Sequence, residues 1–186
     1  MDVQDTALPE VKLITPRRFG DARGFFAETW NAQVFAKAGL DVAFVQDNQS
    51  LSESPGTIRG LHFQAPPHGQ GKLVRCGRGA LFDVAVDIRR GSPRYGHWVG
   101  VELSADNGRM LWVPEGFAHG FVTREPGTEI VYKCTGFYDV ASEGALRWDA
   151  VGIDWGLSGD PILSAKDAAA PNLEALESPF RHEAAA

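Results

Sequence analysis

The side chains best suited to acid–base chemistry gather in a few short stretches of this sequence. One stretch, Arg59-Gly60-Leu61-His62-Phe63-Gln64, is followed closely by Lys72, and a second, Pro114 to Phe121, carries His119. A histidine can exchange protons at neutral pH because its reference pKa lies at about 6.5. Each histidine taken alone is more often a structural or surface residue. The two stretches therefore indicate proton transfer only if the fold brings them together.

Two further candidates lie in the second half of the chain. Alternation along Glu129 to Thr135 places Tyr132 on the face opposite Lys133. Since a lysine marks the wet face of a strand, we expect Tyr132 to point inward, where a tyrosine more often packs than reacts. Asp167 follows Ser164-Ala165-Lys166 and is equally consistent with a helix N-cap.

The spacing Pro-x-Gly-x-x-His, which ends at His119, resembles the second sequence motif of the cupin superfamily. In metal-binding cupins the first motif carries His-x-His and then a carboxylate, whereas this chain offers His62-Phe63-Gln64. Zinc and iron sites normally use about three or four His, Cys or carboxylate ligands, and His62 with His119 is an incomplete set. We therefore expect no catalytic metal at this site.

Strands predominate among the elements that must position these residues. Leu81 to Ile88 alternates strictly, with four apolar side chains on one face and Asp83 and Asp87 on the other. The only strong helical pattern before the C-terminus is Ala27 to Ala38, ended by Gly39, and Ser164 to Leu176 reads as a short helical or irregular closing segment. Further strands are predicted at Gly71–Cys76, Trp98–Leu103, Arg109–Val113, Gly120–Thr123 and Glu129–Thr135. Strands at this spacing, separated by Gly- or Pro-containing turns, predict an antiparallel sandwich or barrel.

Length and composition narrow the classes of protein that this chain could be. Its 186 residues fit one domain, for which we expect a core of about residues 10–176 and a frayed tail at Ala184 to Ala186. A net charge of -6 argues against a protein that grips long polyanions, so no nucleic-acid partner is expected. With two cysteines, no secretory signal and no apolar run long enough to span a bilayer, we expect a cytoplasmic protein with no membrane partner.

Several ordered segments together resemble the dTDP-4-dehydrorhamnose 3,5-epimerase family. They are Phe19–Glu28, Phe44–Asn48, Arg59–Gln64, Gln70–Arg75, Asp83–Arg89, Pro114–Phe121 and Leu163–Asp167. The resemblance implies a cupin-type jelly roll, a double-stranded antiparallel β-barrel with a few short helices. It also implies epimerisation of dTDP-4-keto-6-deoxy-D-glucose at C3 and C5 to dTDP-4-keto-L-rhamnose through an enolate, with no metal or redox cofactor.

The resemblance assigns catalytic roles to four residues of this chain. His62 would be the base, with Asp167 orienting its ring. Lys72 would donate to the enolate oxygen, with His119 nearby and Asp83 in support. Tyr132 would be the acid on the opposite face of the sugar.

Binding roles carry over in the same way. Arg23 and Arg59 would bind the diphosphate, since a guanidinium grips phosphate oxygens in pairs, and Tyr138 would stack on thymine. The remaining contacts to nucleotide or sugar are assigned to Glu28, Gln46, Asp47, Asn48, Glu143 and Lys166. Family members are homodimers, so a homodimer is expected here.

Three alternatives remain open at this point. Some relatives epimerise only C3 or only C5 with similar residues. A non-catalytic sugar-nucleotide-binding cupin would be free to lose His62 or Tyr132, and their joint presence with Lys72 and Asp167 argues against it. A metal-dependent cupin oxygenase or isomerase is disfavoured by Phe63 and Gln64.

Overall fold

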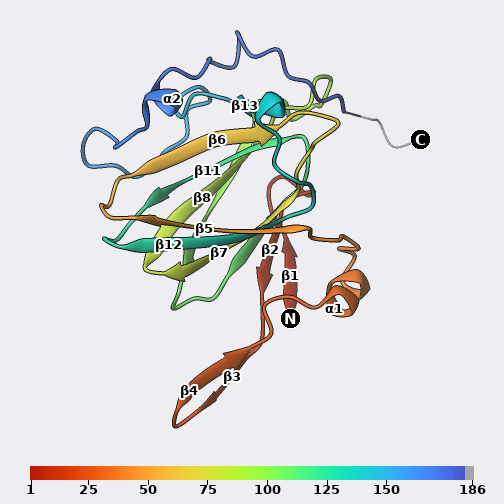
Figure 1. Ribbon diagram of the computed structural model, residues 1–186, viewed down its shortest axis with the longest axis vertical. Coiled ribbons are helices and arrows are strands. Elements are labelled where there is room, and N and C mark those ends of the chain that lie inside the picture. Colours follow the sequence, from red (N-terminus) through yellow and green to blue (C-terminus); the bar gives the residue numbers. More distant parts are fainter. Residues whose placement is uncertain (183–186) are drawn as a thin grey trace.

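Two antiparallel β-sheets face each other and enclose the main apolar core (Figure 1). The computed structural model describes residues 1–182. The larger sheet has the order β1 (Asp2–Asp5), β2 (Lys12–Thr15), β10 (Met110–Val113), β7 (Lys72–Arg78), β12 (Thr128–Cys134) and β5 (Gln46–Ser52). The smaller sheet has the order β13 (Glu143–Ala145), β6 (Ile58–Gln64), β11 (Phe117–Thr123), β8 (Ala80–Asp87) and β9 (Trp98–Ser104).

The chain passes repeatedly from one sheet to the other, so neighbours in a sheet are mostly distant in sequence. From β6 to β12 it crosses between the sheets five times, with only β8 and β9 as consecutive neighbours in the same sheet. This connectivity confirms the predicted jelly roll. Helices are few: α1 (Ala32–Lys37), α2 (Ala165–Ala168) and the 3-10 helix η1 (Val140–Ser142).

Strand β8 is buried on both faces, so the alternating residues on each face include apolar side chains. Leu81 and Ala85 face the core between the sheets, together with the buried carboxyl group of Asp83. Val84 and Val86 face outward and pack under the C-terminal segment, which crosses the outside of the smaller sheet (Figure 1). The chain thus adds a third, irregular layer over this sheet.

The N-terminal region differs most from its prediction. The helix expected at Ala27 to Ala38 begins only at Ala32, because Ala27 ends β4 (Gly24–Ala27), which pairs with β3 (Arg18–Asp21). Asn31 caps the helix by accepting hydrogen bonds from two backbone N–H groups. The predicted end is confirmed, since Gly39 follows the last helical turn with a φ of 86°.

Several strands were not predicted. β5 and the hairpin β3–β4 carry mostly polar or exposed residues, so they lack a clear apolar alternation. β11 begins at Phe117 and includes the Pro-x-Gly-x-x-His histidine, three residues before its predicted start at Gly120. The closing segment is irregular apart from α2, as expected. The tail at Ala184 to Ala186 lies outside the described residues.

Ordered structure extends past the expected core of about residues 10–176 at both ends. β1 pairs with β2, and Phe180 packs edge-on against Phe63 with 5.9 Å between ring centroids. Within residues 1–182, no helix combines the length and apolar character needed to cross a bilayer.

Candidate active site

The two candidate histidines are direct neighbours across two strands. His62 on β6 is the register partner of His119 on β11. The backbones of the two strands approach so closely here that a Cβ atom on Gly60 would lie 2.6 Å from the Cα of Gly120. The register of the pair shifts just after His119. The glycines therefore allow the backbone contact that sets the two imidazole rings side by side.

His62 is held by a buried carboxylate. Its Nε2 lies 2.5 Å from Oδ1 of Asp167, whose side chain is 5% exposed against 34% for His62. Asp167 is fixed in turn by its backbone N–H, which donates to the side-chain oxygen of Ser164 at 3.1 Å. The alternative of Asp167 as the helix N-cap is therefore wrong, because Ser164 caps α2 and Asp167 lies in its first turn.

His119 forms a second histidine–carboxylate pair, deeper in the fold. Its Nε2 lies 2.8 Å from Oδ1 of Asp83 on the neighbouring strand β8, and both side chains are buried. The other oxygen of Asp83 has no hydrogen-bond partner among the described residues. Asp83 therefore holds the His119 ring from the neighbouring strand.

The opposite wall comes from the larger sheet. Lys72 begins β7, and Tyr132 lies on its neighbour β12 with its ring turned toward the core. Tyr132 therefore points inward as expected. Burial lowers the pKa of the Lys72 ammonium and raises the pKa of the Tyr132 phenol, while Arg59 partly opposes the latter shift.

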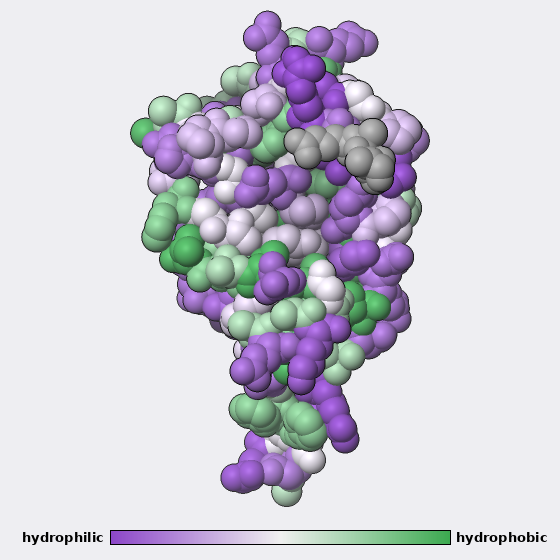
Figure 2. Space-filling model, turned by 90° about the vertical axis from the view of Figure 1, so that its right-hand side faces the viewer, coloured by the Kyte–Doolittle hydropathy of each residue, from purple (hydrophilic) through white to green (hydrophobic). Residues whose placement is uncertain are grey.

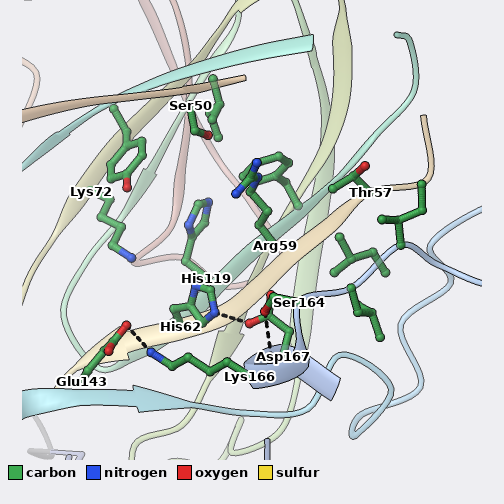
Figure 3. A pocket seen from close by; sticks show the side chains of 16 residues that line it. Ser50, Thr57, Arg59, His62, Lys72, His119, Glu143, Ser164, Lys166 and Asp167 are labelled. Atoms are coloured by element: carbon green, nitrogen blue, oxygen red, sulfur yellow. Dashed lines mark hydrogen bonds and ion pairs between the residues drawn. The ribbon is translucent and has the colours of Figure 1, made fainter. Parts of the chain in front are cut away.

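Together these groups line a cavity of about 450 Å³ between the sheets (Figure 3). A second cavity of about 280 Å³ shares His62, Lys72, Tyr132 and Glu143 with the first. Its other walls are Gln46, Asn48, Phe63, Gln64, Gln70 and Tyr138. The two cavities thus form one elongated site with the acid–base groups where they meet.

The surroundings of His62 favour its neutral form. Burial lowers its pKa most, Asp167 raises it, and the nearby cations Lys72 and Lys166 lower it further. Lys166 forms an ion pair with Glu143 (Figure 3), which also lowers the pKa of that carboxyl group. A neutral imidazole next to a carboxylate is the state that a general base requires.

Most of the predicted binding residues also line this site. Arg59 is anchored by hydrogen bonds from Nε to the Ser52 hydroxyl at 3.1 Å and from Nη2 to the backbone oxygen of Leu51. Tyr138 donates from its hydroxyl to Glu143 at 3.4 Å. The predicted residues brought together at the two cavities are Gln46, Asn48, Arg59, His62, Lys72, His119, Tyr132, Tyr138, Glu143, Lys166 and Asp167.

Four predicted binding residues line neither cavity of their own chain: Arg23, Glu28, Asp47 and Asp83, the last of which is fully buried and bonded to His119. Arg23 lies at the turn of the projecting hairpin with a 90% exposed side chain, and it pairs with Asp21. Glu28 follows the hairpin and accepts a hydrogen bond from Asn31. Asp47 points to the outer face of the larger sheet, where its carboxylate binds Lys133 at 2.9 Å, because side chains alternate along β5.

Other lining residues had no assigned role in the sequence analysis. Ser50 and Thr57 contribute hydroxyl groups, and Ile162 and Leu163 contribute apolar surface from the closing segment. Ser50 could have been found from the two-residue alternation of Gln46 and Asn48, had β5 been predicted as a strand. The contribution of residues 162–163 depends on a tertiary contact that no local pattern reveals.

Metal ligation finds little support in the side-chain chemistry of this site. The ring nitrogens Nε2 of His62 and His119 each face a carboxylate. The two residues that follow His62 are Phe63, which has no ligand atom, and Gln64, which is an amide. Within residues 1–182, no cluster of three or more His, Cys, Asp or Glu side chains has the spacing of a metal site.

The fold and the site define a class of protein: a jelly-roll enzyme whose cavity has a histidine–carboxylate pair on one sheet and a lysine and a tyrosine on the facing sheet. The family model described as dTDP-4-dehydrorhamnose 3,5-epimerase matches residues 5–175. The chain belongs to this family, which confirms the resemblance carried by its sequence motifs and its interpretation as an epimerase of sugar nucleotides.

Relatives match the chain over nearly its whole length. The dTDP-4-dehydrorhamnose 3,5-epimerase of Salmonella typhimurium is 55% identical, over 94% of this chain and 96% of its own. That of Sinorhizobium fredii is 53% identical, over 98% and 94%. The fold is also similar to a crystal structure of the Legionella pneumophila 3,5-epimerase in complex with dTDP-4-keto-L-rhamnose, with a TM-score of 0.94, 44% identity, and coverage of 98% and 99%.

Proposed function

We propose that the site epimerises dTDP-4-keto-6-deoxy-D-glucose at both C3 and C5, giving dTDP-4-keto-L-rhamnose. One observation carries the proposal: His62 and Tyr132 stand on facing sheets and line the same cavity. A sugar bound between the sheets presents one ring face to the base and the other to the acid. Inversion of a carbon needs this arrangement, because the proton must return from the face opposite to the one it left.

Each inversion then proceeds in two proton transfers. Neutral His62 removes the proton from the carbon next to the C4 ketone, and the electron pair of the broken C–H bond moves onto the ketone oxygen. Lys72 donates a hydrogen bond to the enolate oxygen so formed, and Asp167 stabilises the His62 imidazolium. Tyr132 delivers a proton to the carbon from the other face as the ketone re-forms.

The second cavity accommodates the nucleotide in this proposal. Tyr138 lines it and keeps half of its surface exposed, as a ring that stacks on thymine requires. Arg59, which lines the first cavity, presents a guanidinium already oriented by the Ser52 hydroxyl, which suits the diphosphate. Gln46 and Asn48 supply amide groups along the same wall.

We also propose that the protein is a homodimer in which the hairpin β3–β4 reaches the partner's site. The hairpin projects from the lower end of the molecule and shows apolar surface there (Figure 2). Phe25 and Phe26 are 60% and 68% exposed, which is costly unless another chain covers them. The predicted diphosphate ligand Arg23 lies on this hairpin, and the partner's Arg23 would complete the anion site.

The proposed setting is the cytoplasm, with neither nucleic acid nor membrane as a partner. Both cysteines, Cys76 and Cys134, are free thiols in the structure, which fits a reducing compartment.

Two variants test the proposed roles. His62→Ala removes the base, so product formation should fall by at least about a hundredfold, as followed by NMR of the dTDP-sugar. Tyr132→Phe should still exchange substrate protons with solvent while product formation stalls. His97→Ala and Tyr95→Phe, outside both cavities, are the matched controls. Near-normal product formation by His62→Ala would refute the base assignment.

Epimerisation at a single carbon is the second candidate function. A 3'-monoepimerase from Streptomyces bikiniensis, solved with dTDP-quinovose, superposes with a TM-score of 0.86 at 31% identity, covering 91% of this chain and 87% of its own. A product inverted at one carbon only would favour this alternative.

A further inference from the structure

The segment that carries Tyr138 is held at its backbone rather than by its aromatic side chains. Residues 136–139 join β12 to η1 at the mouth of the second cavity. Phe137 and Tyr138 are 67% and 53% exposed, and the Tyr138 hydroxyl makes one long hydrogen bond, to Glu143. Side-chain packing therefore fixes this segment only weakly.

Two glutamines from opposite sheets hold consecutive backbone N–H groups of the segment. The N–H of Tyr138 donates to Oε1 of Gln46 at 3.0 Å, and the N–H of Asp139 donates to Oε1 of Gln64 at 2.9 Å. Gln46 begins β5 in the larger sheet, whereas Gln64 ends β6 in the smaller one. Because the two acceptors lie on separate sheets, they fix both the position and the orientation of the backbone at Tyr138 and Asp139.

A third glutamine holds the start of the same segment. Nε2 of Gln70 donates to the backbone oxygen of Gly136 at 2.8 Å. Gly136 is pressed against the β6–β7 connection, since a Cβ atom there would lie 2.6 Å from the backbone oxygen of Gly69. The close approach therefore brings the carbonyl group of Gly136 within reach of Gln70.

These three side chains, Gln46, Gln64 and Gln70, are called the amide clamp below. All three line the second cavity, and Gln64 is 5% exposed. Neither N–H group belongs to a strand ladder, and the clamp supplies a partner at both residues. The bond to Gln64 is partly buried and the bond to Gln46 is exposed, so Gln64 makes the better shielded of the two contacts. The clamp thus connects the wall of the cavity to the backbone on which Tyr138 is carried.

We propose that Gln64 and Gln70, together with Gln46, are positioning residues that hold Tyr138 over the nucleotide end of the site. The inference rests on the proposed role of Tyr138 in stacking on the nucleotide base. In metal-binding cupins the position of Gln64 is occupied by a histidine that ligates the metal. In this chain Gln64 instead accepts a hydrogen bond from the backbone of the Tyr138 segment. The clamp acts on nucleotide binding and leaves the proton-transfer groups in place.

The test uses Gln64→Met, which keeps the length of the side chain but removes the strong oxygen acceptor. The Kd for dTDP alone, measured by calorimetry, should rise about three- to tenfold, and the KM for the dTDP-sugar, measured by steady-state kinetics, should rise by a similar factor. The kcat value should change by less than KM. Gln33→Met, on the exposed side of α1, is the matched control and should change neither constant.

Two further readouts separate positioning from a general loss of stability. Tyr138→Ala should weaken dTDP binding, and adding Gln64→Met to it should weaken binding little more, because both changes remove one function. Amide hydrogen exchange in the peptide spanning residues 136–142 should accelerate in Gln64→Met, while exchange in the β7 and β12 ladder stays unchanged.

The inference is overturned if Gln64→Met leaves the Kd for dTDP unchanged, or if its effect adds fully to that of Tyr138→Ala. Binding of dTDP is measured without turnover, so this outcome is distinct from a failure of the proposed reaction. A protein that binds dTDP through the clamp but forms no product would contradict the proposed function alone.

Discussion

At the scale of single residues, the pKa of His62 is set by opposing neighbours. Burial and the cations Lys72 and Lys166 favour the neutral ring, whereas Asp167 favours the charged one. The net shift is downward, so His62 remains an available base on the acid side of its ordinary titration range. Proton abstraction should therefore persist to lower pH than an unperturbed histidine would allow.

Removing one of these cations should raise the pH below which His62 becomes protonated and activity is lost. Lys166→Met deletes a positive charge and leaves Glu143 without its ion-pair partner, and both changes raise the pKa of His62. A base must be unprotonated, so the acid limb of the kcat/KM profile should move to higher pH. Lys37→Met on α1 is the control. An unchanged limb, or one at lower pH, would contradict the electrostatic account of His62.

At the scale of elements, the contact between β6 and β11 determines the spacing of the two histidines. Gly120→Ala would place a Cβ atom 2.8 Å from the backbone oxygen of Arg59, which a strand cannot avoid without moving. We expect a loss of about 1–3 kcal/mol in the free energy of unfolding, measured with urea, together with lower kcat.

The control for this variant is Gly159→Ala, where a Cβ atom meets nothing within 4 Å and φ is not positive. That substitution should be nearly neutral in both stability and activity. Equal behaviour of the two variants would show that the close approach of β6 and β11 is unimportant.

The short helix α2 matters because its cap orients Asp167. Ser164→Ala removes the hydroxyl that accepts from the Asp167 N–H, at a cost of about 1 kcal/mol. If that cost falls on the orientation of Asp167, kcat should drop roughly fivefold, whereas Ser164→Thr, which retains a capping oxygen, should recover most of it. Loss of activity in both variants to the same extent would mean that the cap is not what positions Asp167.

At the scale of the whole molecule, the net charge of the chain does not indicate the charge of its site. The chain carries -6 overall, yet Arg59, Lys72 and Lys166 converge on the elongated site. In the proposed function, this local group of cations would bind the anionic diphosphate on a protein that is acidic overall. The net charge argues against a polyanion binder, but it does not indicate where the cations gather.

The proposed homodimer predicts complementation between two inactive variants. In a mixed dimer of His62→Ala and Arg23→Ala, one site receives both lesions and the other receives none if Arg23 acts across the interface. Co-expression at equal levels should then restore about one quarter of wild-type activity, since half of random dimers are mixed and each has one intact site. Arg23 acting within its own chain would give no recovery above the separate variants.

Sequence patterns predicted the parts of this structure that depend on local alternation or on a motif. The strands around β8, the inward Tyr132 and the histidine of β11 follow from apolar spacing and from the Pro-x-Gly-x-x-His motif. The family resemblance added Gln46, Asn48, Tyr138, Glu143 and Lys166 to the residues that line the site. The hairpin β3–β4 was not predicted, because its exposed aromatic residues give no signal for a core face, and the predicted helix overlapped it at Ala27.

Contacts between distant segments could not be predicted from sequence. The amide clamp and the packing of residues 162–163 against the cavity each join segments that are distant in sequence. The outward direction of Asp47 required the register of β5, which polar residues alone do not define. Arg23 and Glu28 lie away from the site of their own chain, and only a second chain could bring them to it.

The central claim is that one cavity moves protons at both carbons next to the ketone. Incubation with dTDP-4-keto-6-deoxy-D-glucose in D2O, followed by NMR and mass spectrometry of the sugar, measures this directly. The account predicts deuterium at both C3 and C5 in the wild-type product, and none at either carbon with His62→Ala. Deuterium at one carbon only would indicate a monofunctional epimerase, and deuterium at neither carbon would contradict the proposed reaction.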